Sequence, residues 1–375
     1  MKRFLTVGLM LAMSTSAIPA ANATQLLYLA SQNDKTIVAY EIDAQSGKLK
    51  PRSRFNLPGN PGPLAFSPDG AFIYAAMTGL EGEQAGVATL ARGQDGSLTL
   101  KGTATLASRA PYIRTSKDGK LLLAAHYGVG DVTVNRITNG ICTSELLDQK
   151  TTEKTAHCIE LDPSGRFVFV PHTSPNKVYQ FVLDAKTGKL TPNNPPFAVG
   201  PDKDHRYHEP RHYVHSPKLN VAYTSNENGG GITAWKFDPQ QGTLTKMQTL
   251  STLPKDFDGQ SAAADIHITP NGRFVYVSNR DVTKRGEGAA MHDSLAGFSI
   301  DPESGKLKRI GHFPTNHFPR SFCIDLTGKF VYAAGQLSSD LFAYRIDQKS
   351  GKLKQLATYE TGAVPIWVMC GEAEK

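Results

Sequence analysis

The chain has few cysteines, and they have no metal-binding spacing. The four among its 375 residues, Cys142, Cys158, Cys323 and Cys370, are dispersed without a Cys-x-x-Cys pair. This pattern excludes zinc-finger motifs, and none of the four lies in a recognisable nucleophile motif. We expect them to serve as small buried hydrophobic residues, and the sequence leaves disulfide pairing open.

Long basic runs and spanning hydrophobic runs are missing as well. The formal net charge of +7 is modest, and no cluster of lysine and arginine is long enough to form a nucleic-acid-binding arm. Beyond residue 23 no apolar segment has the length of a membrane span. We therefore expect no nucleic-acid partner, no membrane insertion of the mature chain, and a monomer.

The first 23 residues have the order of a secretory signal peptide. Lys2 and Arg3 precede an apolar stretch from Phe4 to Met13, and Ala21-Asn22-Ala23 forms a small-x-small cleavage site. This order predicts removal of residues 1–23, a periplasmic or secreted location, and one mature domain over residues 24–375.

A glycine-led turn recurs seven times in the remaining chain, roughly every 50 residues, which is the period of four-stranded propeller blades. Each glycine is followed two residues later by leucine or, once, by cysteine: Gly47, Gly96, Gly140, Gly188, Gly242, Gly305 and Gly351. The sequence therefore predicts an all-β, seven-bladed propeller of four-stranded antiparallel blades.

A second turn recurs in phase with the first. Ser67-Pro68-Asp69-Gly70 is typical, and an apolar run such as Phe72-Ile73-Tyr74 follows each copy. Six such turns are present because the seventh blade is split between the two ends of the chain. We expect Leu26–Ala30 to pair with the segment around Pro365–Met369 and to close the ring.

Aligning the first strands on these turns brings charged residues into equivalent positions. The aligned positions carry His157, Arg211 and Arg320 in three blades and apolar residues in most others. Because the first strand of a propeller blade is innermost, these three side chains should converge at one mouth of the central channel.

The second strands end on the same face. Their last residues include Tyr127, Glu227 and Arg280, so one carboxylate should lie among several arginines. Such a group can hold an oxyanion and offers a candidate base. The alternative is a set of ion pairs that join the blades.

Histidines add to this face through a repeated His-x-Pro-Arg pattern that begins at His208 and at His317. We expect both to contact the ligand. A metal site is disfavoured because His212 and His215 are three residues apart in a strand and should point to opposite faces. Asp265 lies near the channel mouth and could orient Arg211 or Arg320.

On these motifs the chain resembles the propeller lactonases, a family that includes bacterial cycloisomerase-like 6-phosphogluconolactonases and fungal carboxymuconate-cyclising enzymes. The resemblance covers the whole mature chain and is carried by Ala263–Arg273, Pro210-Arg211-His212, Asn226-Glu227 and Pro319-Arg320. It implies a lactone-binding site without metal or cofactor. The site residues of the cyclising enzymes match His157, Arg211 and Glu227, with a further arginine at Arg280 or Arg320.

This resemblance leads to a hypothesis for the reaction. The protein would hydrolyse a sugar lactone such as glucono-1,5-lactone or 6-phosphogluconolactone, with Glu227 accepting a proton from water. Arg211 and Arg320 would stabilise the oxyanion, and His157 would protonate the departing ring oxygen. Arg280, Asp265, His208, His317 and Tyr127 would bind or orient substrate. A muconate cyclase using the same residues and a non-catalytic binding propeller are the alternatives.

Overall fold

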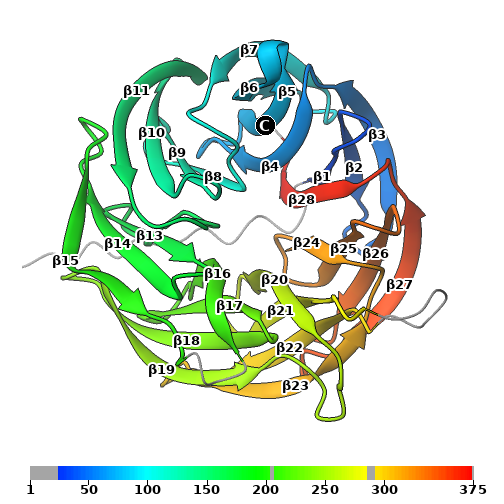
Figure 1. Ribbon diagram of the computed structural model, residues 1–375. Coiled ribbons are helices and arrows are strands. Elements are labelled where there is room, and N and C mark those ends of the chain that lie inside the picture. Colours follow the sequence, from blue (N-terminus) through cyan, green and yellow to red (C-terminus); the bar gives the residue numbers. More distant parts are fainter. Residues whose placement is uncertain (1–23, 203–206, 285–291, 374–375) are drawn as a thin grey trace, which may run out of the picture.

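The computed structural model describes residues 24–202, 207–284 and 292–373. The predicted signal peptide lies outside these residues. The described chain forms a ring of seven antiparallel β-sheets around a central channel (Figure 1). The predicted seven-bladed propeller is therefore confirmed.

Each blade has four strands, which follow one another from the hub outward. Blade 1 contains β28 (Pro365–Glu372), β1 (Gln25–Ser31), β2 (Thr36–Ile42) and β3 (Leu49–Asn56). Blade 2 contains β4 (Asn60–Phe66), β5 (Phe72–Leu80), β6 (Gln84–Arg92) and β7 (Leu98–Thr105), with the short 3-10 helix η1 (Glu81–Glu83) between β5 and β6. Blade 3 contains β8 (Tyr112–Thr115), β9 (Leu121–His126), β10 (Asp131–Thr138) and β11 (Ile141–Thr151).

The other four blades follow the same order around the ring. Blade 4 contains β12 (Glu160–Leu161), β13 (Phe167–His172), β14 (Lys177–Leu183) and β15 (Leu190–Val199). Blade 5 contains β16 (His208–His215), β17 (Val221–Asn228), β18 (Gly231–Asp238) and β19 (Thr243–Ser251). Blade 6 contains β20 (Ser261–Ile268), β21 (Phe274–Asp281), β22 (Ser294–Ile300) and β23 (Leu307–Pro314). Blade 7 contains β24 (Pro319–Ile324), β25 (Phe330–Gly335), β26 (Asp340–Ile346) and β27 (Leu353–Glu360).

The first and last strands close the ring, as the sequence predicts. β1 pairs antiparallel with β28, and Leu26 lies opposite Gly371 while Ala30 lies opposite Trp367. Blades 5 and 6 are also joined at the hub, where Asn228 of β17 pairs with Ala262 of β20.

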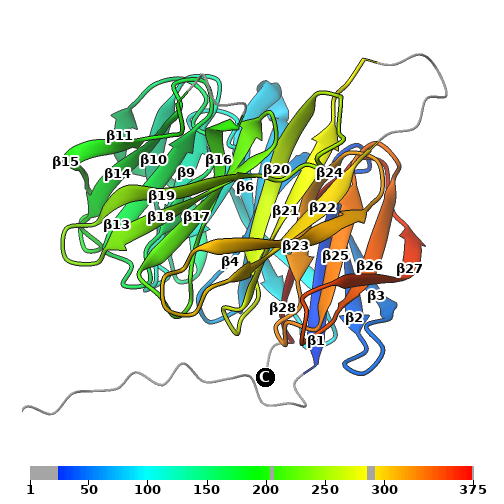
Figure 2. The same ribbon diagram turned by 90° about the horizontal axis from the view of Figure 1, so that it is seen from below.

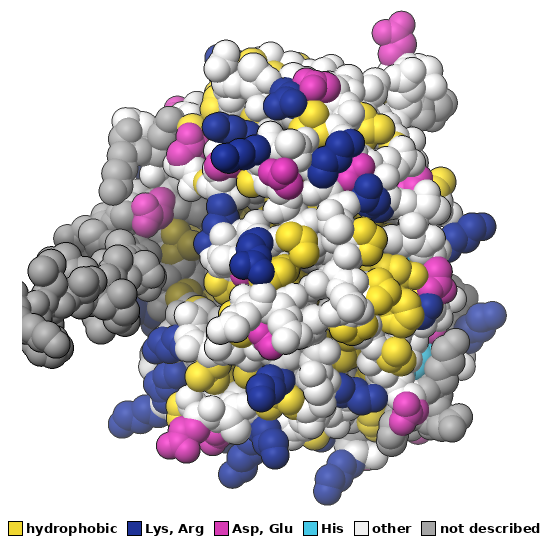
Figure 3. Space-filling model, turned by 90° about the vertical axis from the view of Figure 1, so that its left-hand side faces the viewer, with side chains coloured by type: hydrophobic (Ala, Val, Ile, Leu, Met, Phe, Trp, Pro, Cys, Tyr) yellow, Lys and Arg dark blue, Asp and Glu magenta, His cyan; other side chains and the backbone are white. Residues whose placement is uncertain are grey.

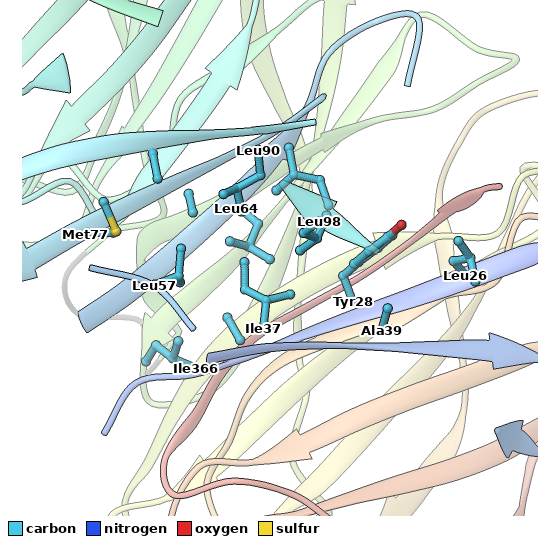
Figure 4. Packing of buried hydrophobic residues seen from close by; sticks show 14 residues of the cluster. Leu26, Tyr28, Ile37, Ala39, Leu57, Leu64, Met77, Leu90, Leu98 and Ile366 are labelled. Carbon is cyan, nitrogen blue, oxygen red and sulfur yellow. The ribbon is translucent and has the colours of Figure 1, made fainter. Parts of the chain in front are cut away.

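The core consists of apolar layers between neighbouring blades. Figure 4 shows the layer between blades 1 and 2, where Tyr28 and Ile37 of blade 1 lie beside Leu64 and Leu98 of blade 2. Burial of these side chains, at about 25 cal/mol per Å² of apolar surface, is the main force that joins the sheets.

The recurring glycine turns connect each blade to the one before it. Tyr74, Tyr223, Tyr276 and Tyr332 occupy equivalent buried positions, and each hydroxyl donates to the carbonyl of the next blade's turn glycine. The turn glycine cannot be replaced cheaply, because Gly47 has φ +75° and a Cβ there would lie 2.3 Å from Phe330. The repeat therefore encodes the contact between blades.

The outer surface of the ring carries charges of both signs. On the side that carries β15, lysine and arginine side chains lie among acidic ones (Figure 3), and in side view the strands of neighbouring blades are inclined to one another (Figure 2). No helix in the described part of the chain is both long and apolar enough to cross a membrane.

Candidate active site at the hub

The inner strands begin with an unusual backbone at the aligned positions. In four blades the residue two positions before the aligned hub position is a non-glycine residue with positive φ: Thr155 (70°), Glu209 (70°), Phe318 (63°) and Val364 (57°). This conformation costs of order 1–3 kcal/mol for a non-glycine residue and is concentrated at functional sites. In three of these blades the strained residue stands two positions before a charged or titratable hub residue, which is His157, Arg211 or Arg320.

A β-bulge follows at the same place. The register of β16 against β17 shifts between Pro210 and Tyr213, and that of β24 against β25 shifts between Pro319 and Ser321. A bulge redirects side chains away from strict alternation. As a result Arg211 and its neighbour His212 both line the hub cavity.

Glu227 receives two arginines on one oxygen. Its Oε1 lies 2.5 Å from Arg280 Nη2 and 3.4 Å from Arg211 Nε. Arg280 is held in turn by the carbonyl of Ala262 and lies 5.1 Å from the Phe318 ring centroid. These contacts leave Glu227 Oε2 without a hydrogen-bond partner among the described residues, so this oxygen is available to a ligand.

Burial and charge act in opposite directions on this carboxylate. Burial alone would raise the pKa of Glu227, but Arg211, Arg280 and Arg320 outweigh it and lower the pKa. Burial also lowers the pKa of Arg211, and the neighbouring arginines add to this effect. Glu227 is therefore ionised at neutral pH and can accept a proton.

His157 lies beside this cluster as a neutral imidazole. Burial lowers its pKa well below the usual value, and Arg211, His212 and Arg320 add to the effect. The ring packs edge-on against Tyr127 at 5.5 Å between centroids, and Nδ1 is buried without a hydrogen-bond partner among the described residues. A neutral imidazole whose Nδ1 has no partner can accept a proton. It is not protonated at neutral pH, so it cannot act directly as a general acid.

Asp265 reaches the arginines through a second histidine. Its Oδ1 accepts from His212 Nδ1 at 2.8 Å, and His212 Nε2 lies 3.1 Å from Arg211 Nη1. Asp265 therefore orients Arg211 indirectly, and no direct hydrogen bond or ion pair joins it to Arg211 or Arg320 among the described residues.

Two adjoining cavities form the mouth of the channel on this face. The larger has a volume of about 400 Å³ and is lined by Ser108, Arg109, Tyr127, Glu227 and others, including His157 and Arg320. The smaller is lined by Arg211, His212, Arg320 and Trp367 among others. A volume of this size suits a ligand as small as a sugar lactone.

Two arginines at these cavities have no acidic partner. Among the described residues, no carboxylate oxygen lies within ion-pair distance of Arg109 or Arg320. Arg320 is half-buried, and burial together with Arg280 lowers its pKa to about 10. Uncompensated positive charge in a cavity favours an anionic ligand or an oxyanion.

The structure brings most of the predicted site residues together. Glu227, His157, Arg211, Arg320 and Tyr127 line the two cavities, whereas Arg280 lines neither and Asp265 lines a cavity toward the other end of the channel. His208 and His317 line neither cavity. His317 Nδ1 is instead bonded to Asp293 at 2.8 Å, and His208 Nδ1 lies 3.7 Å from its neighbour Glu209.

Sequence reasoning missed Arg109, His212 and Trp367 as cavity residues. A signal for Arg109 was present, because it stands two positions before Pro111 just as His208 and His317 stand two positions before their prolines. Strict strand alternation would separate Arg211 from His212, and the bulge in β16 breaks that alternation, so His212 also reaches the cavity.

In the part of the chain that the structure describes, no three His, Cys, Asp or Glu side chains are grouped so that they could hold a metal ion. His215, for example, is buried among Phe169, Tyr213 and Phe237 and bonds the Tyr213 hydroxyl.

The family model described as "Lactonase, 7-bladed beta-propeller" matches residues 26–370. The chain belongs to this lactonase family. It is 31% identical over 352 residues to a 6-phosphogluconolactonase from Pectobacterium carotovorum, covering 92% of this chain and 98% of the relative. A 6-phosphogluconolactonase from Yersinia pestis is 31% identical over 348 residues, covering 92% and 97%.

Several solved structures have the same propeller fold as this chain. The periplasmic gluconolactonase of Pseudomonas aeruginosa has a TM-score of 0.81 at 23% identity, covering 94% of this chain and 100% of that one. A protein from Lactobacillus plantarum also has a TM-score of 0.81 at 23% identity, covering 93% and 100%. At this identity the likeness concerns the fold.

Proposed function

We propose that the protein is an exported lactonase that opens an aldonolactone to its acid, with preference for an anionic one. The observation that carries the proposal is the arrangement of Glu227, His157 and Arg320 around one cavity of the hub. Membership of the lactonase family and the names of the 6-phosphogluconolactonase relatives support it.

Glu227 is the proposed base for the attacking water. Its Oε1 is fixed by Arg211 and Arg280, so its Oε2 can accept a proton as the water oxygen bonds to the lactone carbonyl. The paired arginines keep the carboxylate ionised at neutral pH and fix its orientation.

The carbonyl oxygen becomes negatively charged as water adds. Arg320, which has no carboxylate partner among the described residues, and Arg211 are the donors proposed to stabilise it. Donors in a desolvated pocket act strongly on such an oxyanion, and one of them contributes about 3 kcal/mol to lowering the barrier.

His157 is proposed as a proton carrier. The sequence predicts that it is the acid for the departing ring oxygen, but its buried, arginine-rich surroundings keep it neutral. It would take from Glu227 the proton that came from water and, as an imidazolium among cations, pass it to the ring oxygen as the carbon–oxygen bond breaks, so that both side chains return to their starting states.

The excess of arginine bears on the choice of lactone. Arg109 at the rim and Arg320 inside are without carboxylate partners among the described residues, so a phosphate or carboxylate on the substrate would complete the charge balance. On this ground 6-phosphogluconolactone is preferred over glucono-1,5-lactone.

The experiment compares the two lactones with the purified mature protein. Ring opening is followed by acid release, and a protein-free sample supplies the blank because sugar lactones also open spontaneously. We expect enzyme-dependent opening of both lactones, with kcat/KM about tenfold higher for the phosphorylated one. Equal rates for the native protein and the blank on every aldonolactone would refute the proposal.

A muconate absorbance assay run in parallel tests the cyclase alternative. Absorbance loss with a carboxymuconate, together with no lactone opening, would show that the site catalyses the cyclase reaction instead.

Export is a separate part of the proposal. Mass spectrometry of the protein recovered from outside the cytoplasm should give Thr24 as the first residue, as the small-x-small site ending at Ala23 indicates. Recovery of uncleaved chain in the cytoplasm alone would contradict it. Light scattering should give the mass of a monomer.

A further inference from the structure

His212 has one hydrogen-bond partner on each ring nitrogen. Nδ1 faces Asp265 Oδ1 at 2.8 Å, and Nε2 faces Arg211 Nη1 at 3.1 Å. A carboxylate can only accept and a guanidinium can only donate. Burial, reinforced by Arg211, lowers the pKa of His212 to about 4, so the ring is neutral. Its proton must therefore be on Nδ1, with the Nε2 lone pair facing Arg211.

The ring of His212 is held in place on its other sides by aromatic groups. Tyr112 lies edge-on at 5.1 Å between centroids, His157 lies at 5.2 Å and Trp367 at 6.2 Å. Blades 3 and 4 and the closing strand of blade 1 contribute to this enclosure, so the imidazole has little freedom to turn.

Asp265 is fixed even more firmly. Besides His212, its Oδ1 accepts from the amide of Ile266 at 2.9 Å, and its Oδ2 accepts from the amide of Phe322 at 3.1 Å. His267 Nε2 also lies 3.2 Å from Oδ2. Both oxygens of Asp265 therefore face donors. In an Asp265→Asn variant the side-chain amide nitrogen would face a donor in either orientation.

We propose that His212 is a positioning residue, which transmits the fixed orientation of Asp265 to Arg211 and through it to the Glu227 carboxylate. The ordered chain runs from Asp265 Oδ1 through both nitrogens of His212 to Arg211 Nη1, while Arg211 Nε faces Glu227 Oε1 at 3.4 Å. This inference rests on the proposed function, because it assigns His212 to the same reaction.

Two substitutions separate ring packing from hydrogen bonding. His212→Phe keeps an aromatic ring within the enclosure and removes both hydrogen bonds, so kcat should fall roughly 30-fold with KM changed less than about twofold. His212→Gln returns an acceptor near the Nε2 position and should recover part of the loss. Loss of folding in His212→Phe would be seen by circular dichroism, and His212→Gln then carries the test.

A double-mutant cycle with Arg211→Lys distinguishes positioning from a general structural effect. If His212 acts through Arg211, adding His212→Phe to Arg211→Lys should cost less than about twofold in kcat. Fully multiplicative losses would overturn the proposal.

The tautomer of His212 gives a readout that does not depend on activity. In protein labelled with ¹⁵N-histidine, the His212 signals, identified by their absence in His212→Phe, should be those of the Nδ1–H form. Asp265→Asn should change the Nδ1–H signal, because a neutral amide is a weaker acceptor than a carboxylate, whereas Arg211 keeps the lone pair on Nε2. An Nε2–H form in the native protein would overturn the positioning role, whereas absence of lactone turnover with the predicted tautomer would overturn the proposed function alone.

A second, independent observation concerns two cysteines at the hub. Cys323 Sγ of β24 lies 2.9 Å from Cys370 Sγ of β28, and these strands belong to blades 7 and 1. A disulfide bond of about 2.05 Å would need a shift of about 1 Å. Cys142 and Cys158 are buried elsewhere and remain thiols.

The geometry points to a Cys323–Cys370 disulfide in the exported protein. The two thiols lose two protons and two electrons to a thiol–disulfide oxidant outside the cytoplasm, and an S–S bond forms. The bond would join the closing strand of blade 1 to blade 7, close to the point where the ring is completed.

Intact mass measures this bond directly. Protein recovered from an oxidising compartment should be about 2 Da lighter than the reduced form, and alkylation without reduction should label two thiols. Cys370→Ser should abolish the difference and lower Tm by about 5 °C, whereas Cys142→Ser should leave the mass difference in place. Four alkylated thiols in the unreduced protein would overturn the assignment.

Discussion

The two ends of the central channel differ in how their charges are balanced. At the end where the hairpin turns lie, a cavity of about 230 Å³ contains Arg114 and His267. Arg114 Nε is 3.2 Å from Glu160, and His267 is 3.2 Å from Asp265. At the opposite end, Arg109 and Arg320 have no such partner among the described residues. Paired charges hold blades together, whereas unpaired charges in a cavity indicate a ligand-binding site.

The largest effect should come from the base at the arginine-rich end. Glu227→Gln keeps the shape of the side chain and removes the proton acceptor, so kcat should fall roughly 100-fold or more while folding stays intact. Steady-state rates with the spontaneous reaction subtracted measure this. Glu160→Gln at the other end serves as the matched control. Full activity of Glu227→Gln on every lactone that the native protein opens would transfer the role to another group.

The next effect concerns the oxyanion donors. Arg320→Ala should slow kcat roughly 100-fold, because a charged donor worth about 3 kcal/mol in the transition state is lost. Arg320→Lys should recover part of the rate, since an ammonium does not reproduce the planar fork of a guanidinium. Arg114→Ala, which removes a paired arginine at the far end, should change kcat less than about twofold. Similar losses in both variants would erase the distinction between the two ends.

A smaller and more selective effect is expected at the rim. Arg109→Ala should raise KM for 6-phosphogluconolactone roughly tenfold and leave kcat unchanged, because an exposed arginine binds the anionic group without taking part in bond breaking. The values for neutral glucono-1,5-lactone should not change. An equal KM increase for the neutral lactone would mean that Arg109 shapes the cavity and does not bind the anionic group of the substrate.

The last effect is in the pH dependence of stability and leaves turnover at neutral pH unchanged. Burial lowers the pKa of His172 and His215 to about 4, below the value of about 6.5 in an unfolded chain. The unfolded state therefore binds more protons between these values. The free energy of unfolding should fall as pH drops from about 6.5 toward 4, by at most about 1.4 kcal/mol per pH unit for each histidine.

His267 acts in the opposite direction to these buried histidines. Burial alone would lower its pKa, but Asp265 outweighs burial and raises it. Denaturant midpoints at several pH values measure the balance, and His215→Phe should make the decline shallower. A midpoint that stays constant between pH 7 and 5 would contradict this prediction.

The repeat made the fold and most of the site predictable from sequence. Propeller geometry places equivalent strand positions at equivalent radii, so His157, Arg211 and Arg320 could be brought to one hub from the repeat alone. Closure of the ring by β1 and β28 was predicted for the same reason and is confirmed.

The hydrogen-bond partners within the site were not predictable in this way. The bulge in β16 places Arg211 and His212 at the same cavity although alternation would separate them. Likewise Asp265 contacts His212 and not an arginine, because that choice depends on distances of a few ångströms between blades. Repeat alignment gives the radius and height of a side chain but not its neighbour.

Pairing of β1 with β28 also sets an order of events during folding. Six blades are each built from four consecutive strands and can form as soon as those strands are available, whereas blade 1 needs residues from both ends of the chain. Closing so long a loop is entropically unfavourable, although the penalty grows by about 0.6 kcal/mol for each doubling of its length. The seam is therefore completed last, and hydrogen exchange should find it among the first places to open.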